Sequence, residues 1–325
     1  MANLRAGLLG VGMMGRHHAR VLREMGGVDL VAIADPAGDA HHVAADLPIL
    51  PDIDSLIATG IDMAVVAVPT QFHEEAALAL AAAGVHTMVE KPIAHSVEAG
   101  TRMVQAFDKA EVVGAVGHIE RYNAALQQMR RRIEEGQLGE IYQIMTRRQG
   151  PFPGRIADVG VAKDLASHDI DLTSWVAQSP YASVSARTAC RSGRPHEDML
   201  LVVGALASGV IVNHVVNWLS PVKERVTIVI GERGTFVADT GTADLTYQAN
   251  GTVQSSWEAL STFRGVSEGD IVRYAFPKPE PLRVELEAFR DTILGTAATA
   301  VTMAEGLATL RVVEEVLESA RPGIA

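Results

Sequence analysis

Between residues 4 and 117 the sequence alternates short apolar runs with longer amphipathic segments. The apolar runs are nearly continuous, which is typical of parallel strands covered by helices on both faces. Repeated β–α units of this kind predict a doubly wound parallel sheet, the α/β fold class. The predicted strands are 4–9, 28–34, 63–68, 85–89 and 112–116, and the helices between them are 15–25, 71–83 and 97–110.

A glycine-rich loop follows the first predicted strand and opens the first predicted helix. Its first glycine permits a tight turn, its second lets a pyrophosphate approach the backbone, and its third lets the helix pack closely on the strand. The start of the helix adds amide donors and a partial positive charge. This pattern predicts a Rossmann dinucleotide site. The expected cofactor contacts are Gly10, Gly12, Met13, Met14 and Gly15.

An acid closes the second predicted strand. Asp35 follows Gly15 by 20 residues (35 − 15), where a carboxylate accepts hydrogen bonds from ribose hydroxyls and repels a 2′-phosphate. The next residues, PAGDA, offer no lysine or arginine to hold such a phosphate, although His41 and His42 lie nearby. NAD is therefore favoured over NADP. The alternative is that Asp35 only ends a strand before a turn.

The third predicted strand ends in VAVPTQFH, residues 66–73. In open α/β sheets ligands bind at the carboxyl ends of the strands. Thr70 and His73 are therefore candidates for contact with the cofactor. The alternatives are a helix cap for Thr70 and a first-turn surface position for His73.

The pattern changes after residue 117. Two predicted helices, 122–135 and 163–176, are followed by strands at hairpin spacing, which predicts a C-terminal α+β domain with a large open, mainly antiparallel sheet. Helices 283–294 and 303–319 close the chain. We divide it into an NAD(P)-binding domain, 1–119, and a domain for substrate binding and oligomerisation, 120–325. The predicted strands are 183–189, 200–206, 210–217, 225–230, 235–239, 244–247 and 252–257.

Neither face of strand 210–217 is cleanly polar, whereas a sheet with one face in water alternates more strictly. We expect helices on one face of the C-terminal sheet and another subunit on much of the other. The expected assembly is a homodimer or homotetramer formed through this sheet.

Composition excludes several classes of function. With a net charge of −11 the chain will not bind nucleic acid through bulk electrostatics. One cysteine, Cys190, allows no internal disulfide and fits a reducing cytoplasm. The longest apolar run, near residues 200–212, is too short to span a bilayer. The 11 histidines form no metal-ligand spacing such as H-E-x-x-H, so no metal is expected.

The candidate catalytic residues are a lysine after a predicted strand and an acid–histidine pair on a predicted helix. Lys91 directly follows a predicted strand and so lies at the carboxyl edge of the sheet, although a lone lysine there is usually only solvated. In the segment 158–172, Asp164 and His168 are four residues apart and share one helical face, and Asp171 follows one turn later. An acid beside a histidine fixes its tautomer and raises its basicity. The alternative for His168 is a satisfied structural histidine.

Together these features resemble the Gfo/Idh/MocA oxidoreductases over nearly the whole chain. The resemblance rests on the glycine motif, the acid after the second strand, Glu90-Lys91-Pro92, and the D-x-x-x-H pattern of Asp164 and His168. It implies NAD(P)-dependent oxidation or reduction of sugars, inositols and related polyols. It also implies that Lys91, Asp164 and His168 are catalytic and that Glu90 lies near the nicotinamide ribose.

The residue types agree with that chemistry. Oxidation of a secondary alcohol removes a proton while a hydride leaves the same carbon. An imidazole, with an ordinary pKa of about 6.5, suits His168 to take the proton. Lys91 can hold the hydroxyl and stabilise developing alkoxide charge. The Lys91 ammonium opposes imidazolium formation and Asp164 favours it, so the two together poise His168 near neutrality.

Two further segments resemble the branch of the family that acts on nucleotide-linked amino sugars, notably UDP-N-acetylglucosamine 3-dehydrogenases. These are VGHIERYNAAL, residues 116–126, and RRQGPFPGRIADVGVAKDL, residues 147–165. The branch commonly shows H-I-E-R-F-N-P and R-x-G-P-x-P-x-R-x-x-D-x-G. Tyr122 and Ala124 stand here where phenylalanine and proline are usual.

The same segments predict the substrate contacts. Arg147 and Arg155 can clamp a diphosphate, assisted by Arg121, and Tyr122 and Asn123 can bind sugar hydroxyls or an N-acetyl group. The alternative is that these arginines form surface ion pairs, or that an acid such as Glu120 neutralises one of them.

The expected function is NAD-dependent hydride transfer at a sugar secondary alcohol, most specifically the 3-hydroxyl of UDP-N-acetylglucosamine or a similar nucleotide sugar. One alternative is an inositol or free-sugar dehydrogenase, which needs no phosphate clamp. Another is a non-catalytic NAD-dependent sensor or regulator, which should have lost one of the three catalytic candidates.

Overall fold

The computed structural model describes residues 3–154, 159–251, 267–297 and 299–320, and the chain forms two compact units. Unit 1 comprises Met1–Ile119 and Glu280–Arg311, and unit 2 comprises Glu120–Pro279 and Val312–Ala325. The predicted boundary after residue 119 therefore coincides with the end of the first segment of unit 1. Residues 280–311, which we assigned to the second domain, belong instead to unit 1.

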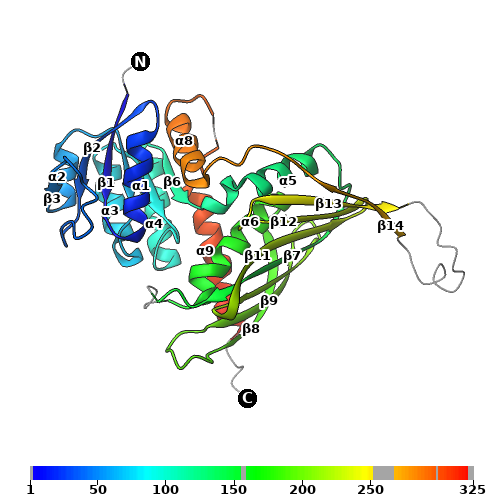
Figure 1. The fold of residues 1–325 in the computed structure, drawn as a ribbon. Helices are drawn as coiled ribbons and strands as arrows, with labels where there is room; N and C mark the ends of the chain where they lie inside the picture. Colours follow the sequence, from blue (N-terminus) through cyan, green and yellow to red (C-terminus); the bar gives the residue numbers. More distant parts are fainter. Residues whose placement is uncertain (1–2, 155–158, 252–266, 298, 321–325) are drawn as a thin grey trace, which may run out of the picture. The chain divides into compact units, whose positions relative to one another are not determined.

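Unit 1 is built on a six-stranded parallel sheet in the order β3-β2-β1-β4-β5-β6 (Figure 1). This confirms the predicted doubly wound sheet. The strand β3 was not predicted because its two residues are too few to show a periodicity. The strands are β1 (Leu4–Leu9), β2 (Val28–Ala34), β3 (Ile49–Leu50), β4 (Met63–Val66), β5 (His86–Glu90) and β6 (Gly114–Gly117).

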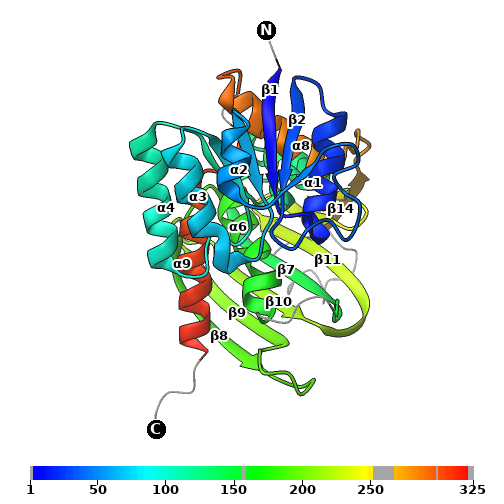
Figure 2. The same ribbon diagram turned by 90° about the vertical axis from the view of Figure 1, so that its left-hand side faces the viewer.

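Helices cover both faces of this sheet (Figure 2). One buried cluster joins α3, α4 and the start of α9 to the sheet, and the other joins α1 and α8. Leu282, Leu286 and Phe289 of α8 lie in the second cluster, which explains why this C-terminal helix belongs to unit 1. The helical elements are α1 (Met13–Glu24), α2 (Ile53–Ala58), η1 (Thr70–Phe72), α3 (His73–Ala82), α4 (Val97–Ala110), α8 (Pro281–Ile293) and α9 (Met303–Ser319).

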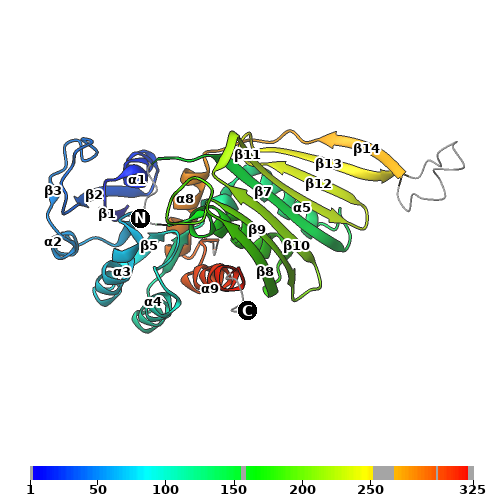
Figure 3. The same cartoon turned by 90° about the horizontal axis from the view of Figure 1, so that it is seen from below.

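Unit 2 contains an eight-stranded sheet in the order β14-β13-β12-β11-β7-β10-β9-β8, parallel only between β7 and β10 (Figure 3). Strands β7 and β14 were not predicted. In β7 the inward-facing Thr146 and Arg148 are polar, which hides the usual alternation. The predicted strand 252–257 lies outside the described residues. The strands are β7 (Ile141–Pro151), β8 (Tyr181–Ala189), β9 (Met199–Leu206), β10 (Ile211–Asn217), β11 (Leu219–Gly231), β12 (Gly234–Asp239), β13 (Asp244–Gly251) and β14 (Ser267–Arg273).

Helices of unit 2 pack on one face of this sheet, as expected. Leu126 and Met129 of α5 share a buried cluster with sheet residues such as Ile144, Val212 and Phe236. The opposite face exposes apolar side chains, including Leu201 at 46%, Val203 at 59% and Ile211 at 49%. The helical elements are η2 (Ile119–Tyr122), α5 (Ala124–Glu134), the π-helix η3 (Ala162–Ala166) and α6 (Ser167–Ala177).

Candidate active site

The glycine loop between β1 and α1 has the geometry that its motif predicts. Gly10 has a φ of +94°, and a Cβ there would lie 2.7 Å from the carbonyl oxygen of Ala67. A Cβ on Gly15 would lie 2.0 Å from the carbonyl oxygen of Gly10. At Gly12, in contrast, nothing lies within 4 Å of a Cβ position. The loop therefore closes tightly at its ends and leaves open space at the glycine that should face a pyrophosphate, so it fits a dinucleotide.

Asp35 is held against this loop. One carboxylate oxygen accepts a 2.8 Å hydrogen bond from the amide of Val11, and the other accepts a 2.8 Å bond from the amide of Ala37. The acid is therefore more than the end of a strand, because it fixes the loop next to β2. Its contact with ribose hydroxyls stays a prediction.

The turn after β4 contains the other two cofactor candidates. Thr70 begins η1 and does not cap α3, whose N-cap is Phe72 without a side-chain hydrogen bond. His73 is not a surface residue, since it is only 1% exposed. Its Nε2 lies 3.0 Å from the carbonyl oxygen of Val68, and its Nδ1 lies 3.0 Å from that of Pro92. His73 thus ties the end of β4 to the turn after β5.

That second turn carries Lys91, whose peptide bond to Pro92 is cis. Glu90, at the end of β5, pairs with the fully buried His18 of α1, with 2.7 Å between Oε1 and Nε2. Its Oε2 accepts a 3.2 Å hydrogen bond from the amide of Lys91. Burial alone would raise the pKa of Glu90, but the interactions with His18 and Lys91 outweigh it and hold that pKa below its usual range.

Asp164 and His168 lie in unit 2, on a helix that is not regular. We expected one α-helix over 163–176, but Asp164 lies in the π-helix η3 and His168 in the α-helix α6. Ser167 at the junction donates a 2.8 Å hydrogen bond to the carbonyl of Lys163. Short π-helical segments occur frequently at functional sites. Asp164 is 8% exposed and His168 is half-buried. Lys91 belongs to unit 1, so it stays a prediction that these two residues form one catalytic site with it.

Beneath α6 lies a buried charge network that we did not predict. Arg148 of β7 donates 2.8 Å and 2.7 Å hydrogen bonds to Asp169 and Glu120. Burial opposes its charge, but the two carboxylates outweigh that effect and raise the pKa of Arg148. Burial raises the pKa of Asp169 despite Arg148. Arg225, the cross-strand neighbour of Arg148, has a pKa lowered by burial and by the Arg148 charge.

Two of the predicted substrate arginines are paired with acids. Arg121, 7% exposed, donates hydrogen bonds from Nε and Nη2 to the two carboxylate oxygens of Asp171, at 2.8 and 2.7 Å. Arg147 forms a 2.5 Å ion pair with Glu224. Because residues alternate along β7, Arg147 points away from the face on which Arg148 meets α6. The pairing of Arg121 and the outward direction of Arg147 argue against their predicted role in a diphosphate clamp.

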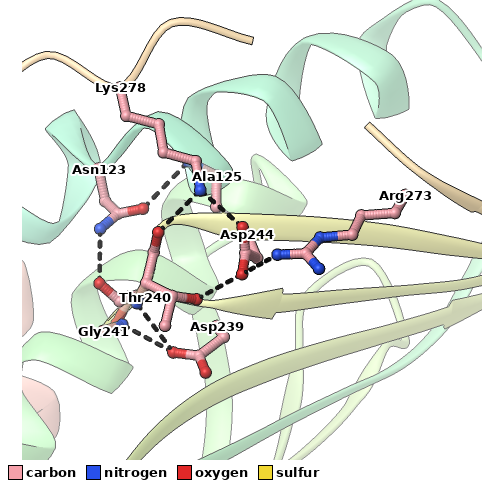
Figure 4. A network of polar contacts seen from close by, with 9 residues as sticks. Asn123, Ala125, Asp239, Thr240, Gly241, Asp244, Arg273 and Lys278 are labelled. Carbon is pink, nitrogen blue, oxygen red and sulfur yellow. Dashed lines mark hydrogen bonds and ion pairs between the residues drawn. The ribbon is translucent and has the colours of Figure 1, made fainter. Parts of the chain in front are cut away.

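Of the other predicted substrate residues, two are buried in the structure and one lies outside the described residues. Asn123, 6% exposed, caps α5 by accepting a 3.0 Å hydrogen bond from the amide of Ala125 and donates a 2.9 Å bond to the carbonyl of Thr240 (Figure 4). Its amide therefore has a structural role. Tyr122 is 4% exposed. Arg155 lies outside the described residues, so its role stays a prediction.

Sequence reasoning missed His18, Arg148 and Asp169. A signal for His18 was present, because it shares the apolar face of α1 with Val21 and Leu22, at the i+3 and i+4 spacing. No local signal distinguishes Arg148 from Arg147.

The described part of the chain lacks both a metal-binding cluster and a membrane-spanning helix. No group of three or more His, Cys, Asp or Glu residues is arranged there to hold a metal ion. Of the helices within those same ranges, none combines the length and the apolarity that crossing a membrane requires.

Two family models match the chain. Residues 4–118 match the oxidoreductase family with an NAD-binding Rossmann fold, and residues 126–237 match the GFO/IDH/MocA C-terminal domain. A UDP-N-acetylglucosamine 3-dehydrogenase of Acidithiobacillus ferrooxidans is 33% identical over 178 residues, 53% of this chain and 54% of that protein. An inositol 2-dehydrogenase of Corynebacterium glutamicum is 29% identical over 226 residues, 65% of this chain and 66% of that protein. The matched region thus spans between half and two thirds of these relatives.

Solved structures resemble the whole chain. The UDP-N-acetylglucosamine 3-dehydrogenase from A. ferrooxidans has a TM-score of 0.85 at 24% identity, with 98% of both chains covered, which supports the fold. The WlbA dehydrogenase from Bordetella pertussis, solved in complex with NADH and UDP-GlcNAcA, has a TM-score of 0.81 at 25% identity. That alignment covers 99% of this chain and 97% of the other.

Proposed function

Because this chain belongs to the Gfo/Idh/MocA oxidoreductase family, we propose that it transfers a hydride between a sugar secondary alcohol and the nicotinamide of NAD. One observation in unit 1 carries the proposal. The glycine loop follows β1 and Lys91 follows β5, so both lie at the carboxyl edge of one parallel sheet. The 2.7 Å contact between His18 and Glu90 connects the helix that follows the glycine loop to the turn that carries Lys91.

NAD is the proposed cofactor. The open position at Gly12 leaves room for a pyrophosphate, and the amides at the start of α1 supply donors, those of Met13 and Met14 included. Asp35 is fixed by two amides in a position that suits ribose hydroxyls and disfavours a 2′-phosphate. The NADH bound in the similar WlbA structure supports the same choice.

The proposed chemistry uses three side chains. The bound nicotinamide would accept the hydride from the carbinol carbon. His168 takes the hydroxyl proton, so the alcohol becomes a ketone and the imidazole an imidazolium. Lys91 holds the same oxygen and stabilises its developing negative charge. Asp164 stabilises the imidazolium.

The leading substrate is a nucleotide sugar oxidised at its 3-hydroxyl, such as UDP-N-acetylglucosamine. Support comes from the 33% identical UDP-N-acetylglucosamine 3-dehydrogenase and from the UDP-GlcNAcA in the WlbA complex. Arg155 and Tyr122 remain the proposed contacts from the segments that resemble this branch.

A second candidate, an inositol or free-sugar dehydrogenase, is favoured by a different observation. The inositol 2-dehydrogenase match covers more of the chain, 65% against 53%. In addition, Arg121 and Arg147 are already paired with Asp171 and Glu224. An uncharged polyol needs no diphosphate clamp.

The experiment that separates these candidates follows the appearance of NADH fluorescence with NAD and one sugar at a time. Reduction of NAD with UDP-N-acetylglucosamine but not with myo-inositol supports the leading proposal, and the reverse result supports the second. Tight NAD binding without turnover of any sugar would identify a sensor or regulator instead. Replacing NAD by NADP tests the role of Asp35, with much weaker turnover expected.

We also propose that the apolar outer face of the unit 2 sheet is a homodimer or homotetramer interface. The exposed Leu201, Val203 and Ile211 lie on neighbouring strands, β9 and β10, and such a patch is typical of an interaction site. Light scattering should give a dimer or larger for the wild type and a smaller species for Val203→Lys. A monomeric wild type at micromolar concentration would contradict the proposal.

A further inference from the structure

We infer that His18 is a positioning residue that holds the Glu90 carboxylate and, through it, the main chain of Lys91. His18 belongs to α1, which opens with the glycine loop, whereas Lys91 carries out its proposed role at the end of β5. The inference deepens the proposed function and rests on it, because it gives a physical reason for where the lysine stands relative to the cofactor helix.

The contact between His18 and Glu90 is well defined. The His18 side chain is completely buried and that of Glu90 is 13% exposed, and Nε2 and Oε1 are 2.7 Å apart. A carboxylate can only accept, so Nε2 of His18 is the donor. The other ring nitrogen, Nδ1, is also buried and has no hydrogen-bond partner within the described ranges. Glu90 is thus the only hydrogen-bond partner of this imidazole there.

The second oxygen of Glu90 acts on the lysine. Oε2 accepts the 3.2 Å hydrogen bond from the amide of Lys91. On the neighbouring strand β6, a Cβ at Gly117 would lie 3.3 Å from this oxygen, closer than most side-chain contacts. The glycine therefore leaves the carboxylate room to lie across the end of the sheet, between α1 and the lysine amide.

A second buried imidazole holds the other side of the same turn. His73 of α3 contacts the carbonyl oxygens of Pro92 and Ile93 at 3.0 and 3.3 Å. These hydrogen bonds fix the chain after Lys91 and involve neither the Glu90 carboxylate nor the lysine amide, although His73 and Glu90 also interact electrostatically. The Glu90 carboxylate, which His18 holds, contacts the lysine amide directly.

Loss of the imidazole should change the charge of Glu90 as well as its position. Burial favours the neutral carboxyl, and the interactions with His18 and Lys91 currently overcome that preference. In His18→Leu the hydrogen bond disappears while burial remains, so the pKa of Glu90 should rise. The carboxyl would then take up a proton at a higher pH than in the wild type and lose its hold on the lysine amide.

The test compares three variants on the full chain. His18→Leu removes the donor, His18→Gln keeps an N–H donor, and His17→Leu changes an exposed neighbour on the same helix. We expect kcat to fall about a hundredfold in His18→Leu, to recover by at least tenfold in His18→Gln, and to stay at the wild-type value in His17→Leu. The dissociation constant of NAD, measured by fluorescence quenching, should change by less than about threefold in each.

The pH profile separates positioning from a merely structural role. The acid limb of kcat should move to higher pH in His18→Leu, and adding Glu90→Gln to this variant should abolish that shift. An unchanged profile and unchanged kcat in a folded His18→Leu would overturn the inference. So would a loss of NAD affinity as large as the loss of kcat, since His18 would then serve the cofactor or the general fold.

A measurement without turnover distinguishes failure of this inference from failure of the proposed function. Carbon-13 NMR of carboxyl-labelled glutamate, assigned with Glu90→Gln, gives the pKa of Glu90 directly. A rise in His18→Leu supports the pairing even if no sugar is oxidised, in which case only the proposed function fails. An unchanged pKa of Glu90 overturns the inference even if the wild type oxidises a sugar.

Discussion

Unit 2 contains two networks of three charged side chains each, one buried and the other exposed to water. Under α6, Arg148 lies between Glu120 and Asp169, and no side chain of the three is more than 15% exposed. At the hairpin between β12 and β13, Asp244 lies between Arg273 and Lys278, with side chains 26–69% exposed (Figure 4). Breaking a buried pair leaves a charge without water or partner, whereas water screens an exposed pair. The first network should therefore stabilise the fold and the second should contribute little.

Residues that are adjacent in the sequence can also differ in burial and in role. His168 and Asp169 are adjacent on α6, yet one is half-buried and proposed to act on substrate, and the other is buried against Arg148. Charge and position in the sequence do not reveal this difference, because it depends on which side of the helix meets the sheet.

The largest expected effect tests the division between catalytic and structural charges. Lys91→Ala or His168→Ala should lower turnover by about two to four orders of magnitude, because each removes a group that acts on the transferred proton or the alkoxide. The free energy of unfolding should change little for His168, which is only half-buried. Steady-state kinetics and urea unfolding measure the two. Near wild-type turnover in both variants would refute the assignment.

The next effect tests the buried network itself. Asp169→Asn should reduce the free energy of unfolding by about 3–5 kcal/mol, because Arg148, only 3% exposed, loses one of its two charged partners in a buried site. Urea denaturation measures the change, and Arg131→Gln, in an exposed pair with Glu135, is the matched control with an expected change below about 0.5 kcal/mol. Equal effects of the two substitutions would remove the distinction between buried and exposed charges.

A third prediction concerns a buried residue of the same sheet that carries no charge. His214 lies 2.7 Å from both Thr146 Oγ1 and the Tyr181 hydroxyl, and burial lowers the pKa of His214 to about 3. The unfolded chain therefore takes up a proton before the folded one does. The stabilisation is complete above about pH 6.5 and is lost as pH falls toward about 3, with a slope of at most about 1.4 kcal/mol per pH unit.

The measurement compares the pH dependence of unfolding in the wild type and in His214→Gln, which retains polar partners for Thr146 and Tyr181. The stability of the wild type relative to His214→Gln should fall as pH falls through this range. A constant difference would mean that folding does not lower the pKa of His214.

The smallest effect belongs to the exposed hairpin. Its two cations hold the pKa of Asp244 below its usual range, but the Asp244 side chain is 26% exposed, so water screens these ion pairs. Asp244→Asn should therefore change the unfolding midpoint far less than Asp169→Asn, and added salt should erase what remains. A loss as large as that of Asp169→Asn, persisting in high salt, would show that the hairpin network is a structural requirement.

Much of unit 1 could be predicted because its signals are local. Apolar runs marked five of the six strands, and Gly10 and Gly15 stand where a positive φ or a close backbone approach excludes a side chain. The acid at Asp35 and the lysine after β5 follow from the same repeat, since parallel strands end at one edge. The short β3 and the return of α8 to this unit lacked any such local sign.

Unit 2 was harder because its decisive contacts join distant residues. The polar inward face hid β7, and the junction of a π-helix with α6 replaced the regular helix expected around Asp164. Arg121 looked available for substrate, but Asp171, 50 residues away, holds its guanidinium.

The sequence by itself therefore determined the order of most elements, the dinucleotide loop and the candidate catalytic residues, because backbone sterics and apolar periodicity act between neighbours along the chain. Only the tertiary structure decided which charged side chains are balanced by a partner. Whether an arginine meets an acid, and whether a histidine holds Glu90 beside the lysine, depends on residues that folding brings together from different segments.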